Sequence, residues 1–198
     1  MNRTLEYYNK HANTFFDGTV SADFKDTQDK FLSLLPPKGL ILDFGCGSGR
    51  DTLYFLQKGF RVNAIDGSKE LCILASKLTG LPVQQMLFQE LEEFEHYDGV
   101  WACSSILHLS KAELKDVFSR MIRATKKGGY IYMSFKYGDF EGYRNERYFT
   151  DFTENGFREY ARIFPEITIL ETWISEDVRP GRSEEKWMNI ILRRLGTT

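Results

Sequence analysis

LILDFGCGSG, residues 40–49, has the pattern of an apolar strand that runs into a loop with glycine at every second position. Glycine has no Cβ and adopts positive φ angles, so such a loop lets the backbone approach a ligand closely. A helix is expected to follow, and the free N–H groups of its first turn would point toward the same place. The segment therefore predicts a strand, a ligand-binding loop and a helix in succession.

The spacing of the glycines separates the ligand classes that such a loop binds. A dinucleotide-binding loop follows the pattern Gly-x-Gly-x-x-Gly or Ala, in which the last small residue packs the helix against the strand. Counted from Gly45, that last position is Arg50, which is neither small nor apolar. A phosphate-binding loop of the Walker type ends in Gly-Lys-Ser or Gly-Lys-Thr, and this loop does not. The pattern that remains is an acidic residue, Asp43, followed by Gly-x-Gly-x-Gly.

A second acidic residue stands where a nucleoside-binding protein needs one. Residues 60–65 have the pattern of a strand, and Asp66 follows at its carboxyl end, about 20 residues beyond the first glycine. A carboxylate at that place reaches both hydroxyls of a ribose, and its charge strengthens the two hydrogen bonds. The competing interpretation is that Asp66 opens a turn with Gly67 and Ser68. The preceding glycine loop favours the ribose-binding role.

Size, charge and cysteine content limit the class of protein. The chain has 198 residues, a mass of 23.1 kDa, a formal net charge of −2 and a pI near 6.0. These values predict one α/β domain without the basic field that attracts nucleic acid or membranes. No apolar run approaches the ~20 residues of a membrane span, and the N-terminus lacks the apolar core of a signal peptide. The three cysteines show no paired spacing, so we expect no disulfide, no metal site and a cytoplasmic location.

Strand-like and helix-like patterns alternate along the chain, which predicts a parallel sheet with helices on both faces. The clearest helix begins at a capping box formed by Ser110 and Glu113 and is expected to end at Gly128–Gly129. The last two strands are expected to pair antiparallel, because the polar segment between them has no helical pattern. The expected strands are residues 40–42, 60–65, 83–88, 97–102, 130–135, 167–173 and 187–192, with further helices at 71–78 and 151–160.

With this order of elements, the chain resembles the class I S-adenosylmethionine-dependent methyltransferases from about residue 39 to residue 135. More narrowly, Tyr7–Ala12 and Phe15–Thr19 are similar to the N-terminal segment of small bacterial methyltransferases grouped with tellurite resistance. The resemblance implies an α/β fold with a Rossmann-like, seven-stranded, mostly parallel sheet, an antiparallel last strand and helices on both faces. It implies one methyltransferase domain, residues 1–198, with a lid (1–35), a cofactor-binding core (39–135) and acceptor-side elements (136–198).

The same resemblance implies that S-adenosyl-L-methionine is the cofactor. In this interpretation the glycine loop lines the cofactor, Asp66 holds its ribose and the N-terminal segment covers it. The adenine contact stays open between Gln89, Glu90 and the backbone, because many relatives carry an aspartate at this place. The residues expected to bind the cofactor are Tyr7, Tyr8, Phe16, Thr19, Asp43, Gly45, Cys46, Gly47, Gly49, Arg50, Asp66, Gly67, Ser68, Gln89, Glu90, Leu91, Cys103 and Ser104.

Two side chains are candidates for catalysis. His108 follows the fourth expected strand, and an unperturbed histidine has a pKa of ~6.5, which suits a general base. The alternative is that His108 packs at the start of the next helix. Tyr8 is expected to lie in the lid above the sulfonium and the acceptor.

Arginines are the main indication about the acceptor. If they converge, they would clamp a carboxylate or phosphate, although interleaved acidic residues explain them equally well as surface ion pairs. A large aromatic side chain would add an apolar wall to the same site. The residues expected to bind the acceptor are Arg144, Arg147, Trp173, Arg179 and Arg182.

The function predicted from the sequence is S-adenosylmethionine-dependent transfer of a methyl group to a small acceptor that is anionic or soft. One alternative is an RNA or nucleotide methyltransferase, against which the absence of a basic stripe argues. Another is a non-catalytic module that binds S-adenosylmethionine. A dehydrogenase is disfavoured by Arg50 in the glycine loop. The expected partner is a small-molecule acceptor rather than a membrane or a nucleic acid, and the expected state is a monomer or homodimer.

Overall fold

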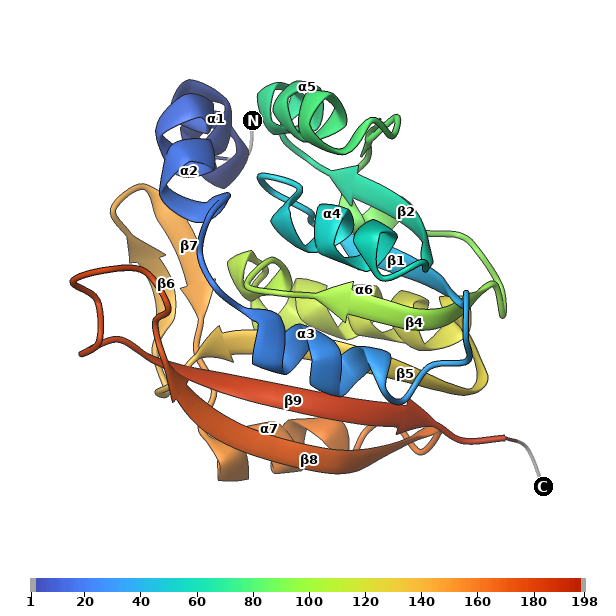
Figure 1. The fold of residues 1–198 in the computed structure, drawn as a ribbon. Helices are drawn as coiled ribbons and strands as arrows, with labels where there is room; N and C mark the ends of the chain where they lie inside the picture. The colour runs from blue at the N-terminus through green and yellow to red at the C-terminus, as the bar shows by residue number, and fades with distance from the viewer. Residues whose placement is uncertain (1–2, 197–198) are drawn as a thin grey trace.

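Seven strands form one sheet in the order β3–β2–β1–β4–β5–β9–β8 in the computed structural model, which describes residues 3–196 (Figure 1). Strand β9 is antiparallel to both of its neighbours, and the pairs among β1–β5 are parallel. This arrangement confirms the predicted mostly parallel sheet with an antiparallel last strand. The strands are β1 Leu40–Phe44, β2 Arg61–Asp66, β3 Gln84–Gln85, β4 Tyr97–Ala102, β5 Thr125–Lys136, β8 Ile167–Glu176 and β9 Lys186–Arg194.

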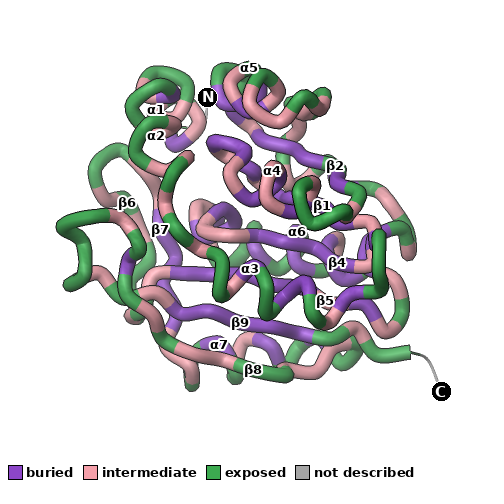
Figure 2. Tube along the Cα trace, in the orientation of Figure 1, coloured by how far each residue is buried: buried purple, intermediate pink, exposed green. Residues whose placement is uncertain are grey.

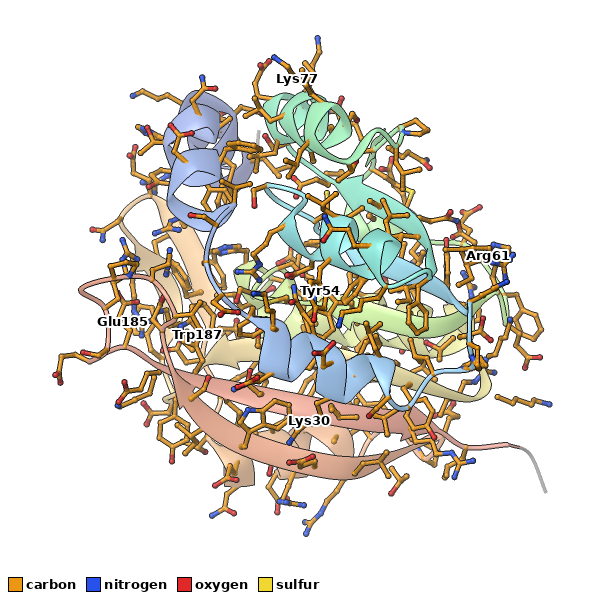
Figure 3. All side chains as sticks on the ribbon, viewed as in Figure 1. Lys30, Tyr54, Arg61, Lys77, Glu185 and Trp187 are labelled. Atoms are coloured by element: carbon orange, nitrogen blue, oxygen red, sulfur yellow. The ribbon has the colours of Figure 1, made fainter. Side chains whose placement is uncertain are left out.

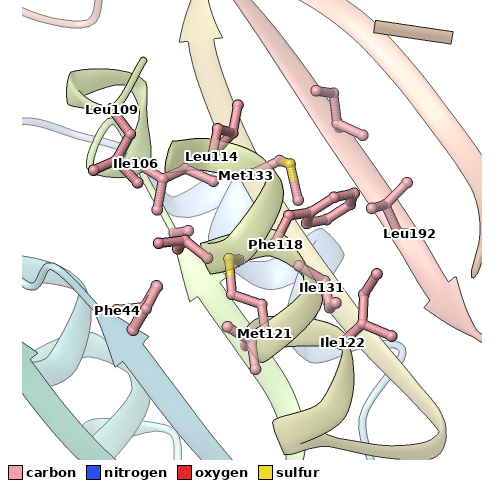
Figure 4. Packing of buried hydrophobic residues seen from close by; sticks show 14 of the residues in the cluster. Phe44, Ile106, Leu109, Leu114, Phe118, Met121, Ile122, Ile131, Met133 and Leu192 are labelled. Atoms are coloured by element: carbon pink, nitrogen blue, oxygen red, sulfur yellow. The ribbon is translucent and has the colours of Figure 1, made fainter. Parts of the chain in front are cut away.

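Helices cover both faces of this sheet, so the chain buries two apolar layers (Figures 1 and 2). On one face, helices α3, α4 and α5 enclose a cluster in which Trp101 stacks on Tyr132 with ring centroids 3.9 Å apart. On the other face, α6 and α7 pack against the sheet through residues such as Phe118 and Met121 (Figure 4). The helices are α3 Lys25–Leu32, α4 Arg50–Gln57, α5 Lys69–Thr79, α6 Lys111–Ala124 and α7 Glu154–Ala161.

Helix α6 and the third strand end at other residues than the sequence predicts. Helix α6 begins at the predicted Ser110–Glu113 capping box but ends at Ala124, before the glycine pair, because Thr125 already pairs with Tyr97 in the sheet. The third predicted strand, residues 83–88, shortens to Gln84–Gln85 and is followed by a 3₁₀ helix, η1 Phe88–Glu90. There the Glu90 carboxylate accepts a hydrogen bond from the Leu87 N–H at 2.7 Å and turns the chain away from the sheet.

Two segments cap the carboxyl ends of the parallel strands. One consists of helices α1 Arg3–Lys10 and α2 Ala12–Thr19, and the other is a hairpin of β6 Glu141–Arg144 and β7 Arg147–Thr150 (Figure 1). The hairpin, which was not predicted, turns through Asn145 and Glu146 with φ angles of 46° and 67°. The Tyr148 N–H donates to the Thr4 hydroxyl at 3.0 Å, so the two segments are joined. No helix among residues 3–196 is long and apolar enough to cross a membrane.

Candidate active site

A cavity of about 860 Å³ opens where the two capping segments meet the carboxyl ends of the strands. Ligand crevices in open α/β sheets lie at this edge, and the volume falls within the ~300–1,000 Å³ typical of small-molecule sites. The glycine loop and the end of β2 line one half, which we call the cofactor half. The capping hairpin, the segment between β8 and β9, and His108 line the other, which we call the acceptor half.

The glycine loop brings backbone to the surface of the cavity at Gly45 and Gly47. Both have positive φ angles, of 87° and 56°, and the N–H groups of Gly45 and Cys46 donate to the Ile65 carbonyl at 3.0 and 2.9 Å. A Cβ on Gly45 would lie 2.5 Å from the Ser105 Cβ, and one on Gly47 would lie 3.1 Å from the ring of Phe15. A side chain at Gly45 is therefore excluded by both conformation and space, whereas one at Gly47 would be strained by the φ angle and would require the Phe15 ring to shift.

Asp66 joins the end of β2 to this loop. One carboxylate oxygen accepts from the Gly47 N–H at 2.9 Å and the other from the Ser68 N–H at 2.8 Å. Burial raises the pKa of Asp66 above its usual range, and these two hydrogen bonds partly offset the rise. The carboxylate lines the cavity and keeps lone pairs for further donors, as the hydroxyls of a ribose would require. The predicted turn and the predicted ribose contact are thus compatible at one residue.

Most of the expected site residues line this one cavity, although they come from distant parts of the chain. Seven of those expected for the cofactor and one expected for the acceptor do not line it. The expected residues that line it are Tyr8, Thr19, Gly45, Cys46, Gly47, Arg50, Asp66, Gly67, Gln89, Cys103, Ser104, His108, Arg144, Arg147, Arg179 and Arg182. The expected residues outside its lining are Tyr7, Phe16, Asp43, Gly49, Ser68, Glu90, Leu91 and Trp173.

Three of the outlying residues support the glycine loop from behind. The Asp43 carboxylate accepts from the Thr52 hydroxyl at 2.5 Å, and burial raises the pKa of Asp43 to about 8. Gly49 faces helix α5, where an added Cβ would lie 3.0 Å from the Ala75 Cβ. Ser68 caps the same helix through its hydroxyl, which accepts from the Leu71 N–H. Asp43 and Gly49 therefore lie on the interior side of the loop, and Ser68 holds the start of helix α5.

Glu90, Leu91 and Trp173 also lie outside the cavity lining, because each contacts another part of the protein. Glu90 caps the 3₁₀ helix η1, and Leu91 is fully buried in the core. Of the two side chains considered for the adenine contact, Gln89 lines the cavity and Glu90 does not. Trp173 on β8 lies under Lys30, whose Nζ is 4.5 Å from the ring centroid (Figure 3 labels Lys30). Trp173 therefore packs against helix α3 and not against the cavity.

Phe15, not Phe16, faces the cavity from α2. Tyr8, Ala12, Phe15 and Thr19 are spaced by four, three and four residues, which is the repeat of one helical face. Tyr8, Phe15 and Thr19 all line the cavity, whereas Tyr7 and Phe16 do not. The helical repeat of this segment was a signal that could have identified Phe15 from the sequence.

Tyr8 and His108 form a hydrogen-bonded pair in the acceptor half. The Tyr8 hydroxyl lies 2.8 Å from His108 Nε2, and His108 Nδ1 lies 2.6 Å from the Tyr148 carbonyl oxygen. A carbonyl can only accept, so Nδ1 carries the proton and Nε2 accepts from the tyrosine. Burial lowers the pKa of His108 to about 4, so the imidazole is neutral near pH 7. The histidine is both packed in place and presented to the lid, which combines the two interpretations that the sequence left open.

Serines and cysteines form the floor between the two halves. Ser104 has a φ angle of 52°, which is rare for a residue with a side chain, and its N–H donates to the Ser134 hydroxyl at 2.8 Å. Burial raises the pKa of the Cys103 thiol to about 12 and also raises that of Cys46. Both thiols stay protonated near neutral pH and are therefore poor nucleophiles.

Three of the four expected arginines already have carboxylate partners. Arg144 forms two hydrogen bonds to buried Asp151, at 2.6 and 3.2 Å. Arg179 likewise binds Asp177, at 2.5 and 2.8 Å. Arg182 lies 3.5 Å from Glu185. All four arginines line the cavity, but ion pairing within the chain neutralises the charge of these three.

The segment between β8 and β9 adds residues that sequence reasoning missed. Asp177 also accepts from the Trp187 indole at 3.1 Å, and Lys136 binds Glu185 while its Nζ lies 4.2 Å from the Trp187 ring centroid (Figure 3 labels Glu185 and Trp187). The hydrogen bonds to Asp177 lower its pKa to about 2 despite burial, which alone would raise it. No spacing in the sequence indicates these contacts, because they depend on the antiparallel pairing of the last two strands.

The sheet order, the glycine loop and Asp66 form the arrangement expected of the class I S-adenosylmethionine-dependent methyltransferases. Residues 41–129 match the family described as "Methyltransferase domain". An uncharacterized methyltransferase of Staphylococcus carnosus is 26% identical over 171 residues, which cover 79% of this chain and 82% of that protein. YqeM of Bacillus subtilis, provisionally assigned to the methyltransferases, is 33% identical over 105 residues. That match covers 49% of this chain, which spans only 42% of YqeM.

Solved structures agree with this assignment at the level of the fold. The 1,6-didemethyltoxoflavin-N1-methyltransferase of Burkholderia thailandensis, solved with that compound and S-adenosylhomocysteine bound, has a TM-score of 0.78 and 21% identity. The superposition covers 98% of this chain and 87% of that one. The comparisons confirm the enzyme type and the cofactor predicted from the sequence: residues 41–129 match a methyltransferase domain, and a protein of the same fold is solved with S-adenosylhomocysteine.

Proposed function

We propose that this protein transfers the methyl group of S-adenosylmethionine to a small-molecule acceptor that is anionic or soft. The observation that carries this proposal is that the glycine loop and the Tyr8–His108 pair line opposite halves of the same cavity. A ligand on the loop and an acceptor beside His108 would thus share one space beneath the lid. The methyltransferase of Burkholderia thailandensis, which is solved with a small heterocycle, offers a parallel.

Each half of the cavity would bind a different ligand. Gly45 and Gly47 would admit the cofactor to the loop, Asp66 would accept from its ribose hydroxyls and Gln89 would face its adenine. We propose that residues 1–35 act as the lid, 39–135 as the cofactor-binding core and 136–198 as the acceptor side of one domain. Residues 1, 2, 197 and 198 lie outside the described part of the chain.

Methyl transfer requires mainly that the protein positions the cofactor and the acceptor. The cofactor supplies an electrophilic methyl group: the acceptor's lone pair forms the new bond as the carbon–sulfur bond breaks and its electron pair remains on sulfur. Correct orientation of two reactants contributes as much as ~7–11 kcal/mol. A proton released by the acceptor would pass to the Tyr8 oxygen while the Tyr8 proton moves to Nε2 of His108, which is neutral and held by Tyr148.

The cavity is suited to a small acceptor. The α1–α2 segment and the β6–β7 hairpin are joined above it by the hydrogen bond between Tyr148 and Thr4. Acidic and basic side chains alternate along the acceptor half, so no continuous basic surface follows a nucleic acid backbone. We therefore favour a metabolite-sized acceptor over RNA.

Radiolabelled S-adenosylmethionine, incubated with the protein and pools of small amines, thiols, carboxylates and phosphates, tests the proposal. We expect label in at least one small product together with stoichiometric S-adenosylhomocysteine, and loss of both in Tyr8→Phe. Label that appears only in added RNA would support the nucleic acid alternative instead. Tight cofactor binding with no transfer to any pool or to cell extract would indicate a non-catalytic binding module.

A further inference from the structure

We propose that Arg147 is the anchor for an oxyanion of the methyl acceptor, and that the other cations of the acceptor half build its wall without binding the acceptor directly. This inference rests on the proposed function, because it concerns the acceptor of the same reaction. It assigns the acceptor to a chemical class: a compound with a carboxylate or a phosphate close to the atom that is methylated.

The first argument is charge. Six other lysines and arginines line the cavity, and each has a carboxylate partner within the chain, as described above for Arg144, Arg179 and Arg182. The other three, Arg50, Lys136 and Lys186, are likewise paired, with Asp51, Glu185 and Glu176. Among residues 3–196, no carboxylate lies within ion-pair distance of Arg147. Arg147 is therefore the cation of this wall, within the described residues, whose charge is not neutralised by the chain.

The second argument is an unused donor. The Nε of Arg147 is buried and has no hydrogen-bond partner, although almost every buried polar atom in a folded protein has one. Within residues 3–196, this guanidinium makes one hydrogen bond, from Nη1 to the Tyr8 hydroxyl at 3.3 Å. A guanidinium presents five N–H donors in a planar fork that matches a carboxylate or phosphate. Most of this fork remains free for a ligand.

The third argument is orientation. The guanidinium carbon of Arg147 lies 4.7 Å from the ring centroid of Tyr7, 5.2 Å from that of Phe149 and 5.8 Å from that of Tyr8. Cation–π contacts of this kind hold a guanidinium in place without neutralising it. The three rings thus keep Arg147 at the cavity wall and exclude water from one side of it.

The fourth argument is position relative to the reacting atoms. The Tyr8 hydroxyl lies between His108 Nε2, at 2.8 Å, and Arg147 Nη1, at 3.3 Å. An oxyanion on Arg147 would therefore lie next to the pair that we propose to receive the acceptor's proton. This places the charged group of the acceptor within a few bonds of its nucleophilic atom.

Anion-dependent thermal stabilisation of the protein saturated with S-adenosylhomocysteine tests the assignment directly. Sodium acetate and sodium phosphate, each compared with chloride at equal ionic strength, are the probes. We expect at least one of them to raise the melting temperature of the wild type by about 2 °C at tens of millimolar. Arg147→Met should remove this shift. A larger effect of acetate indicates a carboxylate acceptor, and a larger effect of phosphate indicates a phosphate ester.

Arg162→Met is the matched control, because it removes the same charge from an exposed ion pair with Glu159 at the end of α7. The control should keep the full anion-dependent shift. Equal shifts in wild type and Arg147→Met, or no shift with either anion, would overturn the assignment. Saturation with S-adenosylhomocysteine is recorded first in the same samples. Failure of that step contradicts the proposed function, whereas saturation followed by anion-independent melting contradicts only the role of Arg147.

Discussion

The two halves of the cavity are built in different ways. The cofactor half is made largely of backbone from adjacent elements: the glycine loop, the end of β2 and the turn after it. The acceptor half is made of side chains from the lid, His108, the β6–β7 hairpin and the segment between the last two strands. Backbone geometry depends on which residues are glycine, whereas the acceptor half depends on how charges pair in three dimensions. The cofactor half can therefore be predicted from the sequence, whereas the contacts of the acceptor half are seen only in the structure.

The largest effect that separates the halves is expected for Gly47→Val. The substitution places a branched side chain at a φ angle of 56° and against the ring of Phe15. We expect the affinity for S-adenosylhomocysteine to fall at least about a thousandfold, or about 4 kcal/mol, while the fold persists. Calorimetric titration and circular dichroism check this, with Gly18→Ala, whose added Cβ would meet no atom within 4 Å, as the control. Unchanged affinity in Gly47→Val would contradict the placement of the cofactor on the loop.

A pH titration of stability probes the acceptor half. The pKa of His108 falls from 6.5 to about 4 on folding, so below pH ~6.5 the unfolded chain takes up a proton that the folded chain does not. Folding stability contributed by neutral His108 is thus fully present above pH ~6.5 and is lost as the pH falls toward about 4, by as much as about 3 kcal/mol. Urea unfolding of wild type and His108→Gln at pH 7.0, 5.5 and 4.5 measures it. The variant should show the flatter profile, and parallel profiles would argue against a buried neutral imidazole.

Asp66→Asn tests the link between the loop and the ribose. The amide keeps the size of the carboxylate but has one acceptor oxygen for the N–H groups of Gly47 and Ser68 and loses the charge that favours diol donors. We expect cofactor affinity to fall about 30-fold, or about 2 kcal/mol. Adenine-site ligands that lack the ribose should lose no affinity in the variant. An equal loss for ligands with and without the ribose would show that Asp66 acts on the loop alone.

The smallest effect is expected for the free energy of unfolding when the two arginines of the hairpin, Arg144 and Arg147, are substituted in turn. Arg144→Met leaves the buried carboxylate of Asp151 without its partner and should lower the free energy of unfolding by about 1–2 kcal/mol, reduced by the partial exposure of Arg144. Arg147→Met removes a cation that has no carboxylate partner among the described residues and should cost less than about 0.5 kcal/mol. Urea unfolding of the two variants decides this. Equal losses would mean that the ring contacts and the Tyr8 hydrogen bond of Arg147 stabilise the fold as much as the ion pair between Arg144 and Asp151 does.

The contrast between the halves also explains which sequence predictions succeeded. The strands, the α6 capping box and the antiparallel last pair follow from apolar periodicity and turn residues, and the structure confirms them. The helical spacing that starts at Tyr8 predicts that Phe15, and not Phe16, faces the cavity. The prediction of a lid from family resemblance does not use this spacing. Trp173 and Arg144 show the limit, since Trp173 packs against α3, which lies far away in the chain, and Arg144 binds Asp151 across a strand pair. Composition reveals that charges are present but not which of them neutralise one another.

The central claim is that the glycine-loop half of the cavity binds S-adenosylmethionine and its product. Calorimetric titration of the purified protein with S-adenosylmethionine, S-adenosylhomocysteine and NAD tests it most directly. The account predicts saturable binding of the first two ligands with one site per chain and no heat from NAD, because Arg50 occupies the position at which a dinucleotide loop needs a small residue. Binding of NAD, or the failure of both adenosyl ligands to bind, would contradict it.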